Sequence, residues 1–319
     1  MSEKRIGVAA MGGDAGIVLD RIQELDRLGI EAAWLTTGGA GLDALTLFSA
    51  AAVRTDGILL GTSITPTWPR HPISAVQQLQ VIANLAPGRF RFGVGPSHRP
   101  SIEPMFGFDF KTPLTNLREY VHIVRSLLHE GAVDFDGRHY HAHARIDAPV
   151  PDLPVMASAL RPGSFEFCGA VADGAISWVC PGEYLRDIAL PAMETGARSA
   201  GRSVVPPLVA HAPVCVHDDP DEVRAASRKQ LAGYPRLPFY ASMFANAGFP
   251  EAEQTHAWSN PMLDAVVISG NEETVAARLR QVLSWGATEL LVSVITAGDN
   301  RTASWERTVR TLAEAGKAL

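Results

Sequence analysis

Hydrophobic and polar positions alternate along this chain in two patterns. Short uninterrupted apolar runs are followed by longer stretches in which apolar residues recur every three or four positions. The short runs are typical of buried parallel strands and the longer stretches of amphipathic helices, so the alternation predicts strands joined by crossover helices. Eight runs can be identified, which is the strand number of a (β/α)₈ TIM barrel. The predicted strands are 6–11, 32–36, 58–64, 90–95, 155–159, 175–179, 208–216 and 289–295.

The connections after the fourth and seventh predicted strands are longer than the others, so these two connections contain insertions. In the first insertion, the dipeptide Asp136-Gly137 between two apolar segments predicts a hairpin with a two-residue turn. The second contains a proline-punctuated segment, 234–261, which we expect to be a mobile excursion rather than a second domain. We therefore predict that residues 1–319 form a single barrel domain.

Composition and charge argue against some classes of function. A chain of 319 residues with 46% hydrophobic and 19% charged side chains is able to bury a large core. Lys and Arg total 28 against 34 Asp and Glu, without a long basic run, which argues against a nucleic-acid partner. The three cysteines, Cys168, Cys180 and Cys215, lack the spacing of a zinc site or disulfide framework and are expected to be buried thiols.

The first residues lead directly into a short apolar run that ends by Met11. This run is too short, and wrongly flanked, for a signal peptide or a membrane span. We therefore expect a cytoplasmic protein without a membrane partner.

Candidate chemistry lies just after the predicted strands, because the active sites of parallel barrels form at the carboxyl ends of the strands. The third strand leads into a segment in which Pro66, Pro69 and Pro72 exclude a helix. Within it, Trp68 is a candidate for a pocket wall or for packing at the top of the barrel. His71 is a candidate for substrate contact or for bracing the backbone.

The segment after the fourth strand reads Gly93-Val94-Gly95-Pro96-Ser97-His98-Arg99-Pro100. Its glycines allow a ligand to approach the backbone closely, and the segment then presents an imidazole and a guanidinium. It is not a dinucleotide-binding fingerprint, because His98 replaces the third glycine and the two prolines are expected to prevent a helix from starting in the usual register. We predict a loop here, continuing to Glu103.

The turn after the fifth strand, Leu160-Arg161-Pro162-Gly163-Ser164, opens a predicted helix. Free N–H groups at such a helix start bind phosphate, and Arg161 adds a positive charge. Trp178, at the end of the sixth strand, is a candidate pocket residue, with plain core packing as the alternative.

Three histidines alternate in the first insertion, at His139, His141 and His143. On a strand this spacing places all three imidazoles on one face, as in some metal sites. Neither a carboxylate nor a cysteine joins them at ligand spacing, so we favour a solvated hairpin face and predict no metal.

Three segments together resemble the luciferase-like monooxygenase superfamily: Ser63-Ile64-Thr65-Pro66-Thr67, 86–95 and Ala172-Asp173-Gly174-Ala175. Further segments, 66–72, Ser97-His98-Arg99-Pro100 and 133–137, resemble a subgroup of F420-dependent oxidoreductases. The resemblance covers nearly the whole chain. It implies a bacterial-luciferase-like TIM barrel, a small-molecule substrate and a homodimer.

The resemblance also implies a cofactor, coenzyme F420 with FMN as the alternative, and the residues that hold it. In F420-dependent relatives a non-prolyl cis peptide backs the deazaflavin ring, and the matching bond here joins Ser63 to Ile64, directly after Thr62. Gly95, Pro96 and Ser97 are expected at the ring edge. The residues expected near the cofactor phosphate are Leu160, Arg161, Pro162, Gly163 and Ser164.

Two departures bear on the reaction. F420-dependent glucose-6-phosphate dehydrogenases carry a His and a Trp in the loop after strand two, where this chain has 36–40, Thr-Thr-Gly-Gly-Ala, so sugar-phosphate activity is not predicted. Their catalytic Glu falls where this chain has His98, an imidazole able to exchange a proton near neutral pH. We predict His98 as the catalytic residue, with Arg99 and Glu103 orienting a polar substrate.

The leading hypothesis is hydride transfer between a deazaflavin and a small organic substrate. The first alternative is an FMN-dependent monooxygenase, in which reduced flavin captures O₂ and the protein shields the peroxide from water. The second is a protein that carries a flavin or deazaflavin without turnover.

Overall fold

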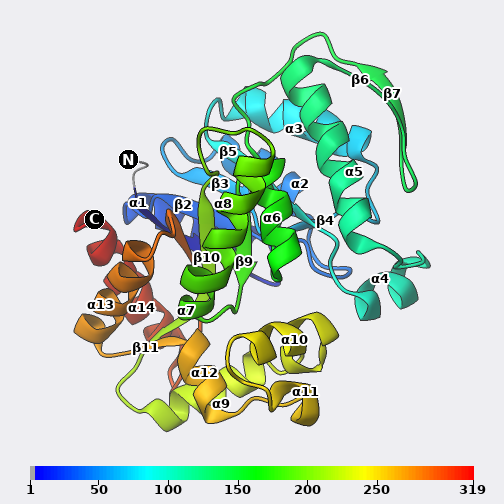
Figure 1. The fold of residues 1–319 in the computed structure, drawn as a ribbon. Coiled ribbons are helices and arrows are strands. Elements are labelled where there is room, and N and C mark those ends of the chain that lie inside the picture. The colour runs from blue at the N-terminus through cyan, green and yellow to red at the C-terminus, as the bar shows by residue number, and fades with distance from the viewer. Residues whose placement is uncertain (1–3) are drawn as a thin grey trace.

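Eight parallel strands close into a barrel in the computed structural model, which describes residues 4–319 (Figure 1). Each strand pairs with the next along the barrel, and the last returns to the first, with Ile6 of β1 opposite Leu290 of β12. The predicted TIM barrel and all eight of its strands are confirmed. The barrel strands are β1 (Arg5–Ala9), β2 (Ala32–Leu35), β3 (Leu59–Thr62), β5 (Phe90–Gly95), β8 (Val155–Ser158), β9 (Ala175–Trp178), β10 (Leu208–Val216) and β12 (Glu289–Val294).

Helices surround the barrel between its strands, and their apolar faces pack on it. Figure 1 shows this outer layer, with the first insertion at one end of the molecule and the second insertion at another. The helices of the barrel layer are α1 (Ala15–Arg27), α2 (Ala44–Ala52), α3 (Pro72–Leu85), α5 (Pro113–Arg125) with the π-helical turn η1 (Ser126–Glu130), α6 (Pro162–Ala170), α7 (Gly182–Tyr184), η2 (Leu185–Ala189), α8 (Leu190–Ser199), α13 (Glu272–Ser284) and α14 (Arg301–Lys317).

The barrel interior is filled around Trp34, which is fully buried. A Cβ atom on Gly7 or Gly61 would lie 2.7 or 2.6 Å from the indole, so these strands carry glycine where the ring passes. The indole N–H donates to the buried carboxylate of Glu289 over 2.7 Å, and this carboxylate also accepts two hydrogen bonds from Arg91. The guanidinium of Arg91 lies 4.3 Å from the centre of the indole ring. The barrel therefore encloses a charged pair whose carboxylate accepts three hydrogen bonds, while the Nε of Arg91 has no partner among the described residues.

The first insertion contains α4 (Arg99–Phe106) and the predicted hairpin, formed by β6 (Ala132–Asp136) and β7 (His141–Arg145). The expected two-residue turn is wrong, because Asp136 pairs with His141 and leaves a four-residue loop. The carboxylate of Glu119, on α5, accepts hydrogen bonds from the backbone N–H groups of Arg138, His139 and Tyr140. A contact with a residue distant in the sequence thus holds the longer loop. The Asp136-Gly137 dipeptide carries no information about that contact.

The second insertion was expected to be a mobile excursion rather than a second domain, and the structure shows regular elements in it. Short helices occupy it, and four of the five have a proline among their first two residues, because proline is well accepted in the first helical turn. A three-residue strand then joins the edge of β10. The elements are α9 (Pro220–Gln230), η3 (Tyr234–Arg236), α10 (Pro238–Asn246), α11 (Ala252–Thr255), α12 (Asn260–Val266) and β11 (Ile268–Gly270), and the remaining short strand, β4 (Thr65–Pro66), pairs with β5.

Two further expectations concern cysteines and membranes. The thiols of Cys168, Cys180 and Cys215 are free and buried, as predicted. Within residues 4–319, we find no helix whose length and apolar content would let it span a bilayer.

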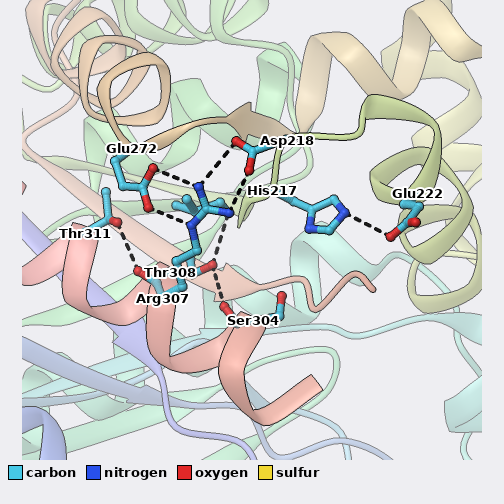
Figure 2. A network of polar contacts seen from close by, with 9 residues as sticks. His217, Asp218, Glu222, Glu272, Ser304, Arg307, Thr308 and Thr311 are labelled. Carbon is cyan, nitrogen blue, oxygen red and sulfur yellow. Dashed lines mark hydrogen bonds and ion pairs between the residues drawn. The ribbon is translucent and has the colours of Figure 1, made fainter. Parts of the chain in front are cut away.

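An ion-pair network fixes α14 to its neighbours (Figure 2). The guanidinium of Arg307 donates to both oxygens of Glu272, at 2.6 and 2.9 Å, and to both oxygens of Asp218, at 3.1 and 3.3 Å. These hydrogen bonds lower the pKa of Glu272 from 4.5 to about 2. Arg307 therefore ties the last helix to the start of α13 and to the loop after β10.

The network predicts a pH-dependent contribution to stability. Because the folded pKa of Glu272 is depressed, its stabilising effect is present above pH 4.5 and is lost as the pH falls towards 2. We expect Arg307→Gln to destabilise the fold by about 1 kcal/mol at pH 7, since the pair is partly exposed. Thermal melts at pH 7 and pH 3 measure this, and the difference from wild type should shrink at pH 3. An equal difference at both pH values would contradict the prediction.

Candidate active site

A cavity of about 1200 Å³ opens at the carboxyl end of the barrel. Every barrel strand contributes to it, seven of them at or just beyond their last residues, which is where parallel barrels place their active sites, and β10 through His211 in its interior. We name one lining residue in or after each strand. In barrel order, they are Met11, Thr36, Ser63, Ser97, Ala159, Trp178, His211 and Ile295.

The end of β3 carries a cis peptide bond between Ser63 and Ile64, as the resemblance implied. Both residues line the cavity. The carbonyl of Ser63 accepts a hydrogen bond of 2.6 Å from the hydroxyl of Thr36, and the carbonyl of Ile64 accepts one of 3.1 Å from the backbone N–H of Thr37. The loop after β2 therefore stabilises this bend through two hydrogen bonds.

Thr62 was predicted as a cofactor contact, but it lies beneath the cavity. Its buried hydroxyl donates to the carbonyl of Gly93 over 2.7 Å and accepts from the N–H of the same residue over 2.9 Å. Gly95 is likewise not part of the cavity wall, because a Cβ there would lie 2.3 Å from the hydroxyl oxygen of Ser158. These two residues join β5 to its neighbours and are not part of the cavity lining.

The residues directly after β5 do line the cavity: Pro96, Ser97 and His98. Ser97 adopts a positive φ of 59°, which is uncommon for a residue with a side chain. The imidazole of His98 is half-buried, and its ring centre lies 5.7 Å from that of Tyr240. Removal from water lowers the pKa of His98 below 6.5, so its ring is neutral at neutral pH.

Arg99 and Glu103 do not face the cavity, which corrects their predicted substrate-orienting role. A helix, α4, starts at Arg99, since the proline that follows lies in the first turn, where its missing N–H costs no hydrogen bond. Arg99 and Glu103 pair with each other one turn apart, with N···O at 2.8 Å. They also hydrogen-bond the carbonyl and the N–H of Phe110. These contacts tie the start of α4 to the connection between α4 and α5.

Trp68 and His71 are also absent from the cavity wall, so their predicted pocket roles are not supported. Trp68 is 8% exposed and packs against Ile102 and Phe110 outside the barrel mouth. His71 caps the start of α3, where its Nδ1 accepts a hydrogen bond of 3.3 Å from the backbone N–H of Ile73. Of the three predicted pocket residues, Trp178 alone lines the cavity.

The five residues of the turn after β8, 160–164, all line the cavity. The hydroxyl of Ser164 braces the turn: it accepts from the N–H groups of Leu160 and Arg161 and donates to the carbonyl of Arg161 over 2.7 Å. Among the described contacts, this leaves the N–H of Gly163 and the guanidinium of Arg161 for a ligand. The guanidinium lies 4.5 Å from the ring centre of Phe239, on α10.

Aromatic residues form one wall of the cavity, and Trp178 is the only one of them that was predicted from the sequence as a pocket residue. Successive ring centres lie 4.0 Å apart from His211 to Trp178, 5.7 Å from Trp178 to Tyr234, and 4.9 Å from Tyr234 to Tyr240. The two tyrosines come from the second insertion, which packs against the barrel mouth. Their position depends on a fold of the insertion that proline spacing alone does not reveal.

His211 lies inside an apolar strand, which is why it carried no signal in the sequence. Burial lowers its pKa to about 3, so the ring is neutral. One ring nitrogen, Nε2, lies 2.8 Å from the hydroxyl oxygen of Ser293. The neighbouring hydroxyl of Ser177 is buried, lines the cavity and has no hydrogen-bond partner among the described residues. It is therefore available to a ligand.

The charged residues of the cavity wall are all of one sign. Within residues 4–319, its lining contains Arg21, Arg161 and Arg301 but no aspartate, glutamate or lysine. This is unusual in a chain with a net charge of −6. The cavity is thus suited to a ligand that carries negative charge.

The hairpin histidines are placed differently from the prediction. His139 lies in the loop, with its Nε2 2.9 Å from the hydroxyl of Thr112, and only His141 and His143 lie on β7. No carboxylate was expected at ligand spacing, yet Asp134 and Asp136 on β6 contact these two histidines. No group of three or more His, Cys, Asp or Glu side chains in residues 4–319 is arranged to hold a metal ion.

Comparison with solved structures identifies close relatives of this fold. An F420-dependent secondary alcohol dehydrogenase in complex with an F420–acetone adduct matches with a TM-score of 0.82 and 16% identity, covering 99% of each chain. The oxygenating constituent of 3,6-diketocamphane monooxygenase from Pseudomonas putida, in complex with FMN, matches with a TM-score of 0.71 and 16% identity over 98% of each chain. At these identities the likeness concerns the fold.

Sequence comparison gives more specific relatives. The F420-dependent glucose-6-phosphate dehydrogenase of Mycobacterium avium is 27% identical over 314 residues, covering 91% of this chain and 86% of the relative. The 5,10-methylenetetrahydromethanopterin reductase of Methanolobus tindarius is 25% identical over 285 residues, covering 83% of this chain and 86% of the relative. The family model for luciferase-like monooxygenases matches residues 3–289. This chain belongs to the luciferase-like monooxygenase family.

Proposed function

We propose that this protein is an F420-dependent oxidoreductase that acts on a small organic molecule. The observation that carries the proposal is one cavity at the carboxyl end of the barrel whose lining joins Ser63 and Ile64, after β3, with the turn 160–164, which we call the phosphate-type turn. Relatives that match most of this chain are named as F420-dependent enzymes, which supports the same cofactor.

The residues of the cavity fit this cofactor. A volume of about 1200 Å³ exceeds the usual range for small-molecule sites and has room for both a tricyclic ring and a substrate. Ser63, Ile64 and Ser97 would contact the ring, and the turn 160–164 would hold the phosphate through the Gly163 N–H and the Arg161 guanidinium. The absence of carboxylates from the described cavity lining removes a repulsion that a phosphate would otherwise meet.

When bound, coenzyme F420 supplies a two-electron centre that exchanges a hydride with an organic substrate. The protein must then move the accompanying proton. A ring nitrogen of His98 is the candidate acceptor, since burial keeps the imidazole neutral at neutral pH. In oxidation of an alcohol it would take the hydroxyl proton, and in reduction of a ketone it would return it. The aromatic wall from His211 to Tyr240 would keep water from the reacting carbon.

The loop after β2 bears on the substrate. Thr36, Thr37, Gly38 and Gly39 all line the cavity, with small side chains where glucose-6-phosphate dehydrogenases of this type carry His and Trp. We therefore propose a substrate other than a sugar phosphate.

The cofactor is tested by titrating the purified protein with coenzyme F420 and with FMN. We expect F420 to bind at least about tenfold more tightly, a difference of about 1.4 kcal/mol. Arg161→Gln should weaken F420 binding about tenfold, because it removes a charge-assisted contact to phosphate. Arg99→Gln is the matched control, since this arginine does not line the cavity.

The same experiment separates the alternatives. Tighter binding of FMN, together with O₂ uptake by the reduced complex, would replace the proposal with a flavin monooxygenase. Tight F420 binding without turnover of any alcohol, ketone or enone in a substrate panel would favour a cofactor carrier.

Two expectations complete the proposal: the enzyme acts in the cytoplasm and as a homodimer. A mass measurement in solution, by light scattering behind a sizing column, tests the second.

A further inference from the structure

A second positive region lies in the same cavity, away from the phosphate-type turn. Arg21 on α1 and Arg301 on α14 both line it, together with Thr296, Thr302 and Trp305. We call these five residues the α1–α14 pole. No part of the proposed function described above uses them.

The two arginines of the pole are held by neutral partners. The guanidinium of Arg21 donates to the carbonyl of Met11 and lies 5.6 Å from the centre of the Trp305 ring. The Nε of Arg301 donates to the hydroxyl of Thr296 over 3.1 Å. Among residues 4–319, neither forms an ion pair with a carboxylate. Many other arginines of this acidic chain do, including Arg91, Arg224 and Arg307.

Hydrogen bonds hold α14, which carries part of the pole, against the barrel. The hydroxyl of Ser304 accepts from the N–H of Ala297 over 3.1 Å, and that of Thr308 accepts from the N–H of Val216 over 3.0 Å. With the Arg307 network in Figure 2, these contacts anchor α14 to the strands beneath it. Arg301, the first residue of α14, also lies at the positive end of this helix dipole.

Barrel topology separates the pole from the cofactor phosphate. The order of strands is β1, β2, β3, β5, β8, β9, β10 and β12, so β1 and β8 lie on opposite sides of the barrel. The phosphate-type turn follows β8. The pole belongs to the connections after β1 and β12. A cofactor held at β8 and extending towards the bend after β3 leaves the β1 and β12 side open to the substrate.

We propose that the α1–α14 pole binds an anionic group of the substrate, a carboxylate or a phosphate, and so selects acids over neutral molecules. This rests on the proposed function, because the acid would be the compound oxidised or reduced. Guanidinium groups recognise both anions through paired N–H donors. Because neither arginine pairs with a carboxylate of residues 4–319, the pole carries positive charge that an anionic ligand would neutralise.

The test uses three probes of similar shape, benzoate, phenyl phosphate and benzamide, titrated by calorimetry into the F420-loaded protein. We expect at least one anion to bind tenfold or more tightly than benzamide, and the tighter anion identifies the group preferred. The double variant Arg21→Gln, Arg301→Gln should reduce this preference below twofold while the Kd for F420 changes less than twofold. Arg310→Gln, an exposed arginine on the same helix paired with Glu306, should keep the wild-type preference.

Equal binding of the three probes to the wild-type protein would overturn the inference, as would a preference retained in the double variant. Loss of F420 affinity in the double variant would also overturn it, by assigning the pole to the acidic tail of the cofactor. The proposed function fails separately, if F420 itself does not bind. The same titrations with the cofactor-free protein then still decide whether the pole binds anions. Thermal melts of each variant verify folding, and the single substitutions serve if the double variant is unstable.

Discussion

Replacing His98 with alanine is expected to lower turnover with coenzyme F420 by about 10² to 10⁴-fold, the usual contribution of a positioned acid or base. The imidazole lines the cavity and is half-buried, and burial keeps it neutral and ready to accept a proton. Cofactor affinity should change less than twofold, because the predicted phosphate contacts lie at Arg161 and Gly163. The measurement is kcat from the deazaflavin absorbance, with a substrate taken from the panel, alongside the Kd for F420.

His71→Ala is the matched control for this variant. His71 is an exposed histidine outside the cavity, so turnover should stay near the wild-type value. The pH profile adds a second readout. If His98 is the base, turnover by the wild-type enzyme should fall only below pH 6.5, the ordinary histidine pKa, because the pKa of His98 is lowered. Unchanged turnover in His98→Ala, or an acidic limb above pH 7 in the wild type, would remove His98 from the mechanism.

Glu289→Ala is expected to destabilise the fold by about 3 to 5 kcal/mol, since it leaves the charge of Arg91 enclosed without a partner. The carboxylate is 3% exposed and accepts from the Trp34 indole as well, so two donors lose their acceptor together. Urea unfolding at pH 7 measures the change in free energy. The substitution also opens a cavity beside the indole, which adds to the loss.

The control for this prediction is Glu306→Ala, which breaks an exposed pair with Arg310 and should cost about 0.5 kcal/mol or less. A double variant, Arg91→Met with Glu289→Met, should recover much of the lost stability, because it removes both buried charges at once. A loss for Glu289→Ala as small as the control would show that the barrel interior admits water to Arg91.

Local pattern was sufficient for the barrel and for part of the site. Each strand is a short apolar run whose period differs from that of the flanking helices, so all eight were predicted within about two residues of their ends. The turn at 160–164 was found because its residues directly follow a strand, and the bend at Ser63–Ile64 was implied by the family resemblance. In a parallel barrel that position leads to the mouth.

The wrong site predictions share one cause. A side chain next to a strand end can point either into the cavity or away from it. Trp68, His71, Arg99 and Glu103 follow strands, yet they pack outside the mouth or pair with each other. Thr62 and Gly95 are one residue short of the cavity, where strand neighbours enclose them. The direction in which such a side chain points depends on where the next helix begins and on how the segment packs. Neither of these produces a periodic pattern in the sequence.

The sequence by itself determined the strand number, the alternation that closes the barrel and the chemical character of the strand-end loops. These follow from hydrophobic period and backbone chemistry, which act over a few residues. Only the tertiary structure decided which arginines lack acidic partners, how the second insertion brings Tyr234 and Tyr240 to the mouth, and where Arg21 meets Trp305. Those contacts join residues far apart in the chain, so their energies depend on the closed barrel and not on any local segment.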